Sequence, residues 1–283
     1  MNEFRWHEMK NRDIPHVENL LRDMENDCVA ACGRFLIREA SNSTDPVWLL
    51  SRNKEELLAL LMSSRSTLIP VLCGIREIPD TKFLKSFFRK KRIHSVQGLK
   101  DEVLVFENAL EKMDIFTSDV FDYDLMSLDS LPLQKERLSI FKNVVLRVPQ
   151  PVDLDQIAPL QAAYEQEEVI PRGSVFSPAA SRINLSKIIT GGKILAAEIE
   201  GRIVGKINIS AVSFTRYQVG GVYVHPDFRG KGIARFMAAE FITSLINEGR
   251  GVTLFVKKNN APARRLYLGL GFKTRDDYRI AYY

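Results

Sequence analysis

The sequence predicts a protein of the mixed α/β class, in which helices and a mixed sheet are divided between two domains. Its 283 residues, 45% hydrophobic and 27% charged, supply enough apolar material for two ordinary cores. Segments with apolar residues at helical spacing alternate with short apolar runs typical of strands. The alternation becomes regular after residue 143, so we expect domains at 1–143 and 144–283.

In the first half, helices and strands are expected to alternate. Apolar residues from Val17 to Cys28 recur at helical spacing, which predicts one amphipathic helix over residues 14–32 with Pro15 in its first turn. Asn53 and Asp80 precede further helix-like runs, and another helix is expected over residues 100–113. Residues 67–75 read as a strand, whereas 117–132 lack helical periodicity and are assigned to no element.

The second half predicts a regular order of elements. Two helices come first, over residues 153–169 and from Ser177 onward. A hairpin about Glu200 and Gly201 follows, then a strand that runs into a glycine-rich turn and a helix. The expected strands are 143–148, 193–199, 202–210, 217–224, 252–257 and 278–283, and the later helices are 233–247 and 260–268.

Composition and charge narrow the functional classes. No apolar run approaches the ~18 residues of a membrane span, and the amino terminus is too charged for a signal peptide, so we expect a cytoplasmic protein with no membrane partner. Three cysteines without zinc spacing read as buried thiols, and no metal is expected. A net charge of +5 suits an anionic ligand. The basic run 85–92 could suggest nucleic acid, but an amphipathic helix explains it more economically.

A strand runs through two glycines straight into a helix at residues 224–234. Glycines let the backbone adopt positive φ and approach a ligand, so successive N–H groups can point at phosphate oxygens. The helix N-terminus adds partial positive charge, and Arg229, Lys231 and Arg235 add cations. This segment therefore predicts an anion cradle, although a similar turn can also be a plain solvated connection.

Two motifs resemble the GNAT superfamily of N-acetyltransferases. The run Arg229-Gly230-Lys231-Gly232-Ile233-Ala234 is similar to the family's pyrophosphate loop at every position. The run Asn260-Ala261-Pro262-Ala263-Arg264-Arg265-Leu266-Tyr267, followed by Gly271-Phe272, is similar to the family's second signature. The resemblance covers about residues 146–283. It implies a GNAT fold and acetyl-CoA as co-substrate.

The resemblance also implies roles for individual residues. The loop from Arg229 to Ala234 would bind the pyrophosphate, and the strand end Val222-Tyr223-Val224 would bond the pantetheine arm. Backbone N–H groups of Tyr223 or Val224 would then stabilise the oxyanion. Asn260 and Ala263 would also contact the cofactor, unless Asn260 serves only as a helix cap. Tyr267 would protonate the leaving thiolate, since a phenol matches a thiol in basicity; a packing role is the alternative.

The general base is less defined. Many relatives place a glutamate on the fourth strand, where this chain has Gln218, Gly220 and Gly221. Glu168, in an acidic cluster on the domain's first helix, could attract or deprotonate the amine, or could lie on a solvated face. A water-relayed base is a further alternative. His225, placed before a proline in a turn, is more typical of a loop histidine than of a base.

The first half lacks both motifs, so a degenerate copy of the same fold would bind no CoA and would shape the acceptor pocket or a homodimer contact. The expected function is acetyl transfer from acetyl-CoA to a primary amine of a small molecule, by direct attack in a ternary complex. A protein amine as acceptor, or a catalytically weak CoA-binding regulatory module, stays open.

Overall fold

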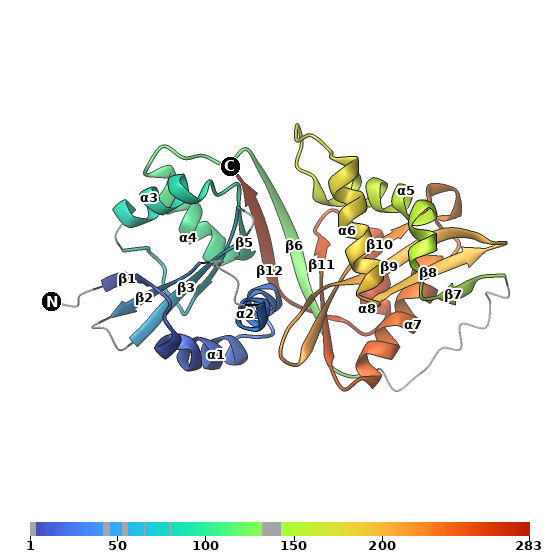
Figure 1. Ribbon diagram of the computed structural model, residues 1–283, viewed down its shortest axis with the longest axis horizontal. Coiled ribbons are helices and arrows are strands. Elements are labelled where there is room, and N and C mark those ends of the chain that lie inside the picture. The colour runs from blue at the N-terminus through green and yellow to red at the C-terminus, as the bar shows by residue number, and fades with distance from the viewer. Residues whose placement is uncertain (1–3, 42–45, 53–55, 65, 80, 132–142) are drawn as a thin grey trace.

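The computed structural model describes residues 4–41, 46–52, 56–64, 66–79, 81–131 and 143–283. The N-terminal half begins with a strand and two helices and continues with strands and two further helices (Figure 1). Its elements are β1 (Phe4–Glu8), η1 (Asn11–Asp13), α1 (Ile14–Asp23), α2 (Val29–Ser41), β2 (Val47–Arg52), β3 (Glu56–Ser64), β4 (Thr67–Leu72), α3 (Thr81–Lys91), β5 (Ser95–Leu99), α4 (Lys100–Glu111) and β6 (Asp119–Leu128).

Local sequence signals, such as a helix cap and a hairpin turn, account for several elements of the C-terminal half. The Ser177 hydroxyl accepts a hydrogen bond from the Ala180 N–H and so caps a helix, and Glu200 and Gly201 both take positive φ in the hairpin turn. The elements are β7 (Val145–Arg147), η2 (Pro151–Asp153), α5 (Leu154–Tyr164), the π-helical turn η3 (Glu165–Val169), α6 (Pro178–Thr190), β8 (Ile194–Ile199), β9 (Arg202–Val212), β10 (Arg216–Val224), η4 (Pro226–Phe228), α7 (Ile233–Asn247), β11 (Gly251–Lys257), α8 (Ala261–Gly269) and β12 (Lys273–Tyr282).

One mixed sheet of 12 strands runs through both halves, in the order β1-β2-β3-β4-β5-β12-β6-β11-β10-β9-β8-β7. Read from its two ends, the sheet repeats one pattern. Four strands pair antiparallel, then β4 pairs parallel with β5 in one half and β10 pairs parallel with β11 in the other. The N-terminal half therefore has the strand arrangement of the C-terminal half, as expected for a copy of the same fold.

The two halves exchange a strand where they meet. β6, from the N-terminal half, pairs with β11, and β12, from the C-terminal half, pairs with β5. β6 and β12 also pair with each other at the centre of the sheet (Figure 1). Each of these two strands therefore completes the sheet of the other half. The domain boundary expected near residue 143 stays a prediction.

Helices cover both faces of the sheet. In the C-terminal half, α7 and α8 pack on one face through residues such as Met237 and Phe241, and α5 and α6 pack on the other through Leu160 and Leu185. In the N-terminal half, α3 and α4 cover one face and α1 and α2 the other. Glu25 ties the halves together, because its carboxylate accepts hydrogen bonds from the Ser213 hydroxyl and from Thr215 N–H and Oγ1, each at 2.6 Å.

Two expectations about local structure are wrong, and one unassigned stretch forms a strand. The helix expected over residues 14–32 is two helices, because the chain turns at Met24 and α2 starts anew at Val29. The helix-like run after Asn53 forms β3 from Glu56 onward, while residues 53–55 lie outside the described residues. The unassigned stretch 117–132 contains β6, in which Phe121, Tyr123 and Leu125 alternate with aspartates and which pairs with β11 and β12.

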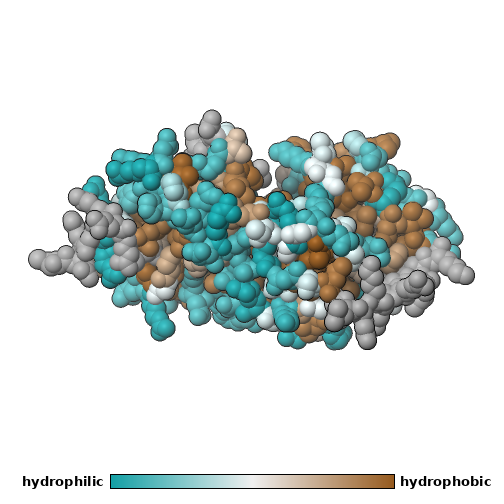
Figure 2. Space-filling model, turned by 90° about the horizontal axis from the view of Figure 1, so that it is seen from below, coloured by the Kyte–Doolittle hydropathy of each residue, from teal (hydrophilic) through white to brown (hydrophobic). Residues whose placement is uncertain are grey.

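In the part of the chain that the structure describes, no helix is both long and apolar enough to cross a membrane. On the face that Figure 2 shows, hydrophilic residues cover most of the N-terminal half, and hydrophobic residues gather over the C-terminal half.

The basic run 85–92 lies largely on α3, which buries Leu84, Phe87 and Phe88 in the core. This amphipathic packing agrees with the more economical interpretation of that run.

Candidate active site

A cavity of about 570 Å³ lies where β10 and β11 separate. The two parallel strands pair from Arg216 and Gly251 as far as Val219 and Leu254, and beyond that point both line the cavity. The N-terminal half supplies Ala30, Gln97 and Tyr123 to the same wall. The parting of two parallel strands thus leaves backbone groups available to a ligand, which is where open sheets bind cofactors.

The end of β10 directs alternate N–H groups into this cavity. His225 N–H donates to the Val204 carbonyl at 2.8 Å and so faces β9. Because successive residues of a strand direct their N–H groups to opposite sides, Tyr223 N–H also faces β9, whereas Val222 and Val224 face the cavity. Of the two oxyanion donors expected from the sequence, the geometry favours Val224 over Tyr223, and it adds Val222.

The glycine loop has the backbone of an anion cradle. Gly230 and Gly232 take φ values of +76° and +80°, and Gly232 is the N-cap residue of α7. The loop is exposed, Ile233 is buried in the core, and Ala234 lines the cavity. The first N–H groups of a 15-residue helix therefore point from an exposed loop toward one end of the cavity.

The cations of this loop are tethered to neighbouring groups. Arg229 donates to the Val224 carbonyl and to Glu167, each at 3.0 Å, and Lys231 Nζ donates to the Asp227 carbonyl at 3.0 Å. These contacts hold positive charge beside the loop. His225 lies against Asp227 and Arg202 in the turn, as a loop histidine would.

The second motif forms the first turns of α8. Asn260 Oδ1 accepts the Ala263 N–H at 3.1 Å, so Asn260 does cap the helix, and both residues line the cavity. Tyr267 is 6% exposed, lines the cavity and meets Phe272 edge to face. Burial, with Tyr164 and Glu168 nearby, raises the pKa of Tyr267 above its ordinary value. The Tyr267 hydroxyl therefore keeps its proton at neutral pH and can donate it.

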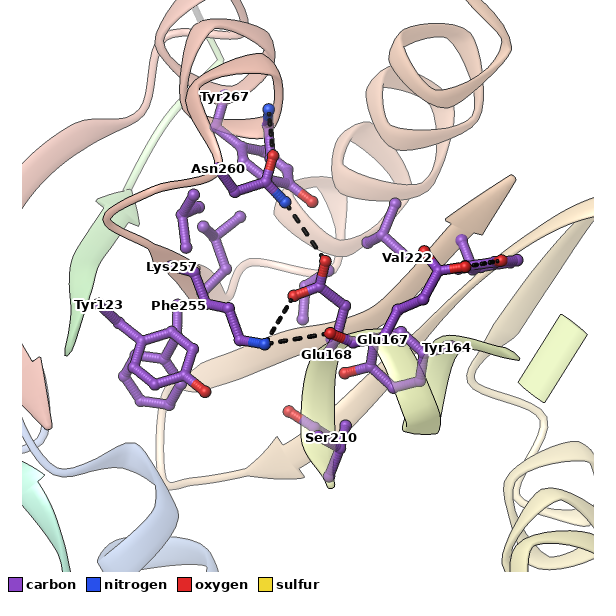
Figure 3. Close-up of a pocket in the computed structure, with 18 of the residues that line it drawn as sticks. Tyr123, Tyr164, Glu167, Glu168, Ser210, Val222, Phe255, Lys257, Asn260 and Tyr267 are labelled. Carbon is purple, nitrogen blue, oxygen red and sulfur yellow. Dashed lines mark hydrogen bonds and ion pairs between the residues drawn. The ribbon is translucent and has the colours of Figure 1, made fainter. Parts of the chain in front are cut away.

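Glu168 projects into the cavity between Lys257 and Asn260 (Figure 3). Its carboxylate lies 3.3 Å from Lys257 Nζ and 3.5 Å from Asn260 Nδ2. Lys257 Nζ also donates to the Glu167 carbonyl at 3.2 Å. The structure thus places Glu168 at the site instead of on a solvated helix face, with its charge balanced by Lys257.

At Gln218, Gly220 and Gly221, β10 carries no carboxylate, and only Gln218 of these has a polar side chain. Its Nε2 donates to Ser210 Oγ at 3.0 Å, and both side chains line the cavity. Its Oε1 is buried and has no hydrogen-bond partner among the described residues. An amide at this position can orient an amine as an acceptor, but it cannot take up a proton.

Lys206, which the sequence analysis missed, lies buried beside the β10 bulge. Its Nζ donates to Asn208 Oδ1 at 3.0 Å and to the Gly221 carbonyl at 2.8 Å. Burial lowers the pKa of Lys206 to about 7. A signal was available, because this lysine interrupts the otherwise apolar core of the strand run RIVGKINIS.

The end of the cavity nearest the N-terminal half is aromatic. Phe255 and Tyr278 stack with ring centroids 3.9 Å apart, and the Tyr123 ring lies 6.4 Å from that of Phe255. Tyr282 closes this end by donating to the Val169 carbonyl at 3.3 Å. Among the described residues that line the cavity, the charged side chains are Glu167, Glu168, Arg229 and Lys257, whose two negative and two positive charges balance.

In the N-terminal half, the position that corresponds to this cavity has almost no free space. There β4 and β5 separate after Leu68 and Val96, but the space that remains is about 10 Å³, too small for a cofactor. Glu102 accepts the Leu72 N–H at 2.6 Å within it, and burial raises the pKa of Glu102 to about 7. Within the described residues, no cluster of three or more His, Cys, Asp or Glu side chains forms a metal site in either half.

Comparison with known proteins agrees with this geometry. Residues 160–272 match the sequence model of the acetyltransferase (GNAT) family. A stretch of 72 residues is 38% identical to the cysteine-rich protein 2-binding protein of Homo sapiens, across 25% of this chain and 9% of that protein. The stretch of this chain that matches thus covers less than a tenth of the length of that relative.

Solved structures match over the whole chain. A GCN5-related N-acetyltransferase from Sphaerobacter thermophilus superposes with a TM-score of 0.64 and 18% identity, over 98% of this chain and 94% of that one. A tandem GNAT protein from the clavulanic acid biosynthesis pathway gives 0.58 and 12%, over 99% and 98%. At these identities the likeness concerns the fold alone. Taken with the family match and the site geometry, it identifies the C-terminal half of this chain as a GNAT acetyltransferase domain.

Proposed function

We propose that the protein transfers an acetyl group from acetyl-CoA to the primary amine of a small molecule, by direct attack in a ternary complex. One observation carries this proposal. A single cavity is lined by Arg229 and Ala234, which flank the glycine loop, by Val222 and Val224, and by Tyr267 and Glu168. The groups that acyl transfer needs therefore share one cavity.

At the loop end, the residues suit the phosphates of CoA. The N–H groups that follow Gly230 and Gly232 would bind the pyrophosphate, with Arg229 and Lys231 nearby. The Val224 N–H would bond the pantetheine arm as an added strand would, which leaves the Val222 N–H for the thioester carbonyl. Acetyl-CoA would supply an activated thioester. The carbonyl oxygen of that thioester would lie against backbone N–H donors of β10.

Two side chains, Tyr267 and Glu168, then donate and accept protons. As the amine nitrogen bonds to the thioester carbon, the carbonyl oxygen gains negative charge beside the Val222 N–H. When the carbon–sulfur bond breaks, Tyr267 donates its proton to the sulfur and regains one from solvent, while the proton lost by the amine leaves by way of water to Glu168 or solvent. Glu168 already forms an ion pair with Lys257, so it is not free to contact the amine alone. A water-relayed base is therefore part of the proposal.

The acceptor end favours a small amine with an apolar or aromatic body. Tyr123, Phe255 and Tyr278 offer ring faces, and the cavity has no net charge with which to attract a polycation. Residues of the N-terminal half close the wall on this side, where a protein acceptor would need an open groove. We therefore propose that the N-terminal half shapes the acceptor pocket.

Release of free thiol from acetyl-CoA in the presence of an amine panel tests this function. The panel contains phenethylamine, spermidine, glucosamine and a lysine-containing peptide, and phenethylamine is expected to have the highest kcat/KM. Faster turnover of the peptide would replace the proposal by protein acetylation. Acetyl-CoA binding without turnover on any amine would replace it by a regulatory module, for which the Gln218 amide in place of a carboxylate already argues.

A further inference from the structure

Lys206 is a buried cation without a carboxylate partner. It lies in the middle of β9 with 0% exposure, and no carboxylate of the described residues reaches ion-pair distance of its Nζ. The Tyr164 ring lies 4.8 Å from Nζ, and Glu165 attracts the ammonium from the turn after α5. Burying an ammonium in this way is costly, so a lysine at this position calls for a functional reason.

The groups around Nζ form one fitted unit, which we call the bulge unit: Lys206, Asn208 and Gly221. The register between β9 and β10 shifts between Gly220 and Tyr223, and Gly221 takes a φ of +59°. A Cβ on Gly221 would lie 2.0 Å from Asn208 Oδ1 and 2.7 Å from Lys206 Nζ. Only glycine fits there, so the backbone bulge and the lysine depend on each other.

The bulge unit connects Lys206 to the cavity through one peptide group. The carbonyl of Gly221 and the N–H of Val222 belong to the same planar trans peptide and point in opposite directions. The carbonyl accepts a hydrogen bond from Lys206 at 2.8 Å, on the β9 side, and the N–H faces the cavity. A charged donor on the carbonyl withdraws electron density and makes the N–H at the other end a stronger donor.

We propose that Lys206 is a positioning residue that polarises the Gly221–Val222 peptide, so that Val222 N–H stabilises the negative charge that develops on the thioester oxygen. This role rests on the proposed function. Donors aimed at such an oxygen act in the transition state more than in the ground state, so Lys206 contributes to kcat and not to acetyl-CoA affinity.

The protonation state of Lys206 sets the strength of this effect. Burial brings the pKa of Lys206 to about 7, with Glu165 acting in the opposite direction. Below that pH the charged ammonium donates to Gly221, and above it the neutral amine donates more weakly. Tyr164, whose hydroxyl bonds the Gly221 backbone, stays neutral because burial raises its pKa. The Val222 amide should therefore report the titration of Lys206.

Selective isotope labelling makes that amide visible. The sequence contains two Gly–Val pairs, 221–222 and 251–252, so protein labelled with ¹³C-carbonyl glycine and ¹⁵N-valine gives two correlated amide signals. Val252 lies in the paired part of β11 and is the internal control. We expect the Val222 amide to shift with a midpoint near pH 7 and Val252 not to shift.

Two variants separate this titration from other causes. Lys206→Met should abolish the step, and Asn208→Asp, which adds a carboxylate next to Nζ, should move it to higher pH. A step that persists in Lys206→Met would come from another group and would overturn the proposal. So would a wild-type Val222 amide that does not titrate. Neither result depends on acetyltransferase activity, so the proposed function is judged separately.

Kinetics supply the second readout. Lys206→Met should lower kcat about tenfold or more, while the KM for acetyl-CoA stays within about twofold of wild type. Lys187→Met, on the exposed face of α6, is the matched control and should leave both unchanged. An unchanged kcat in Lys206→Met, or a KM that rises as much as kcat falls, would reduce Lys206 to a structural role.

Discussion

Gly221→Ala should destabilise the fold through two separate effects. The φ of +59° places an alanine in the left-handed region, which costs roughly 1–2 kcal/mol. The new Cβ would also lie 2.0 Å from Asn208 Oδ1, and relieving such overpacking typically costs about 1–3 kcal/mol. Together these effects predict a loss of about 2–5 kcal/mol in the free energy of unfolding.

Gly220→Ala provides the matched control one residue earlier. Its Cβ would lie 3.2 Å from the Ser210 side chain, and its φ is not positive, so about 1 kcal/mol or less is expected. Equilibrium urea unfolding of both variants, with the slope compared to wild type, gives the two values. A Gly221→Ala protein as stable as the Gly220→Ala protein would refute the account of the bulge.

Three further predictions concern single side chains. Tyr267→Phe should lower kcat by about 10²–10⁴-fold without changing the acetyl-CoA dissociation constant, as measured by steady-state kinetics and calorimetry. Glu102 has a raised pKa, so folding stability should fall as pH rises from about 4.5 to 7, and Glu102→Gln should stabilise the protein by about 1–3 kcal/mol at pH 8 in urea unfolding. Burial alone would raise the pKa of Glu25, but hydrogen bonds from Ser213 and Thr215 lower it. Glu25 therefore stabilises the fold above its unfolded pKa of about 4.5, and this stability is lost as pH falls further. Glu25→Gln should remove that acid-dependent part in thermal melts.

The cofactor end of the site could be predicted from the sequence because its signals are local. Glycines before an apolar helix indicate positive φ whatever the rest of the chain does, and Gly230 and Gly232 have it. Asn260 precedes α8 as a helix cap should. Most elements of the C-terminal half likewise follow from hairpin glycines and helical periodicity.

Other parts of the structure depend on contacts between distant segments. In β6, Phe121, Tyr123 and Leu125 alternate with aspartates as in a strand, but this local pattern does not say that β11 and β12 flank it. No pattern in residues 119–128 encodes partners more than a hundred residues away. Lys206 is similar, because its lysine stands out in the strand but its target, the Gly221 carbonyl, is defined only once β9 and β10 pair with a bulge.

Calorimetric titration of the full chain with acetyl-CoA tests the central claim most directly. Ala234 lies in the first turn of α7 and lines the cavity, so Ala234→Glu puts a carboxylate where the pyrophosphate should bind, while a negative charge there favours the helix. Ala234→Gln has the same size without the charge. We predict that wild type binds acetyl-CoA, that Ala234→Glu does not, and that Ala234→Gln binds more tightly than Ala234→Glu. Absence of binding by the wild type would contradict the account.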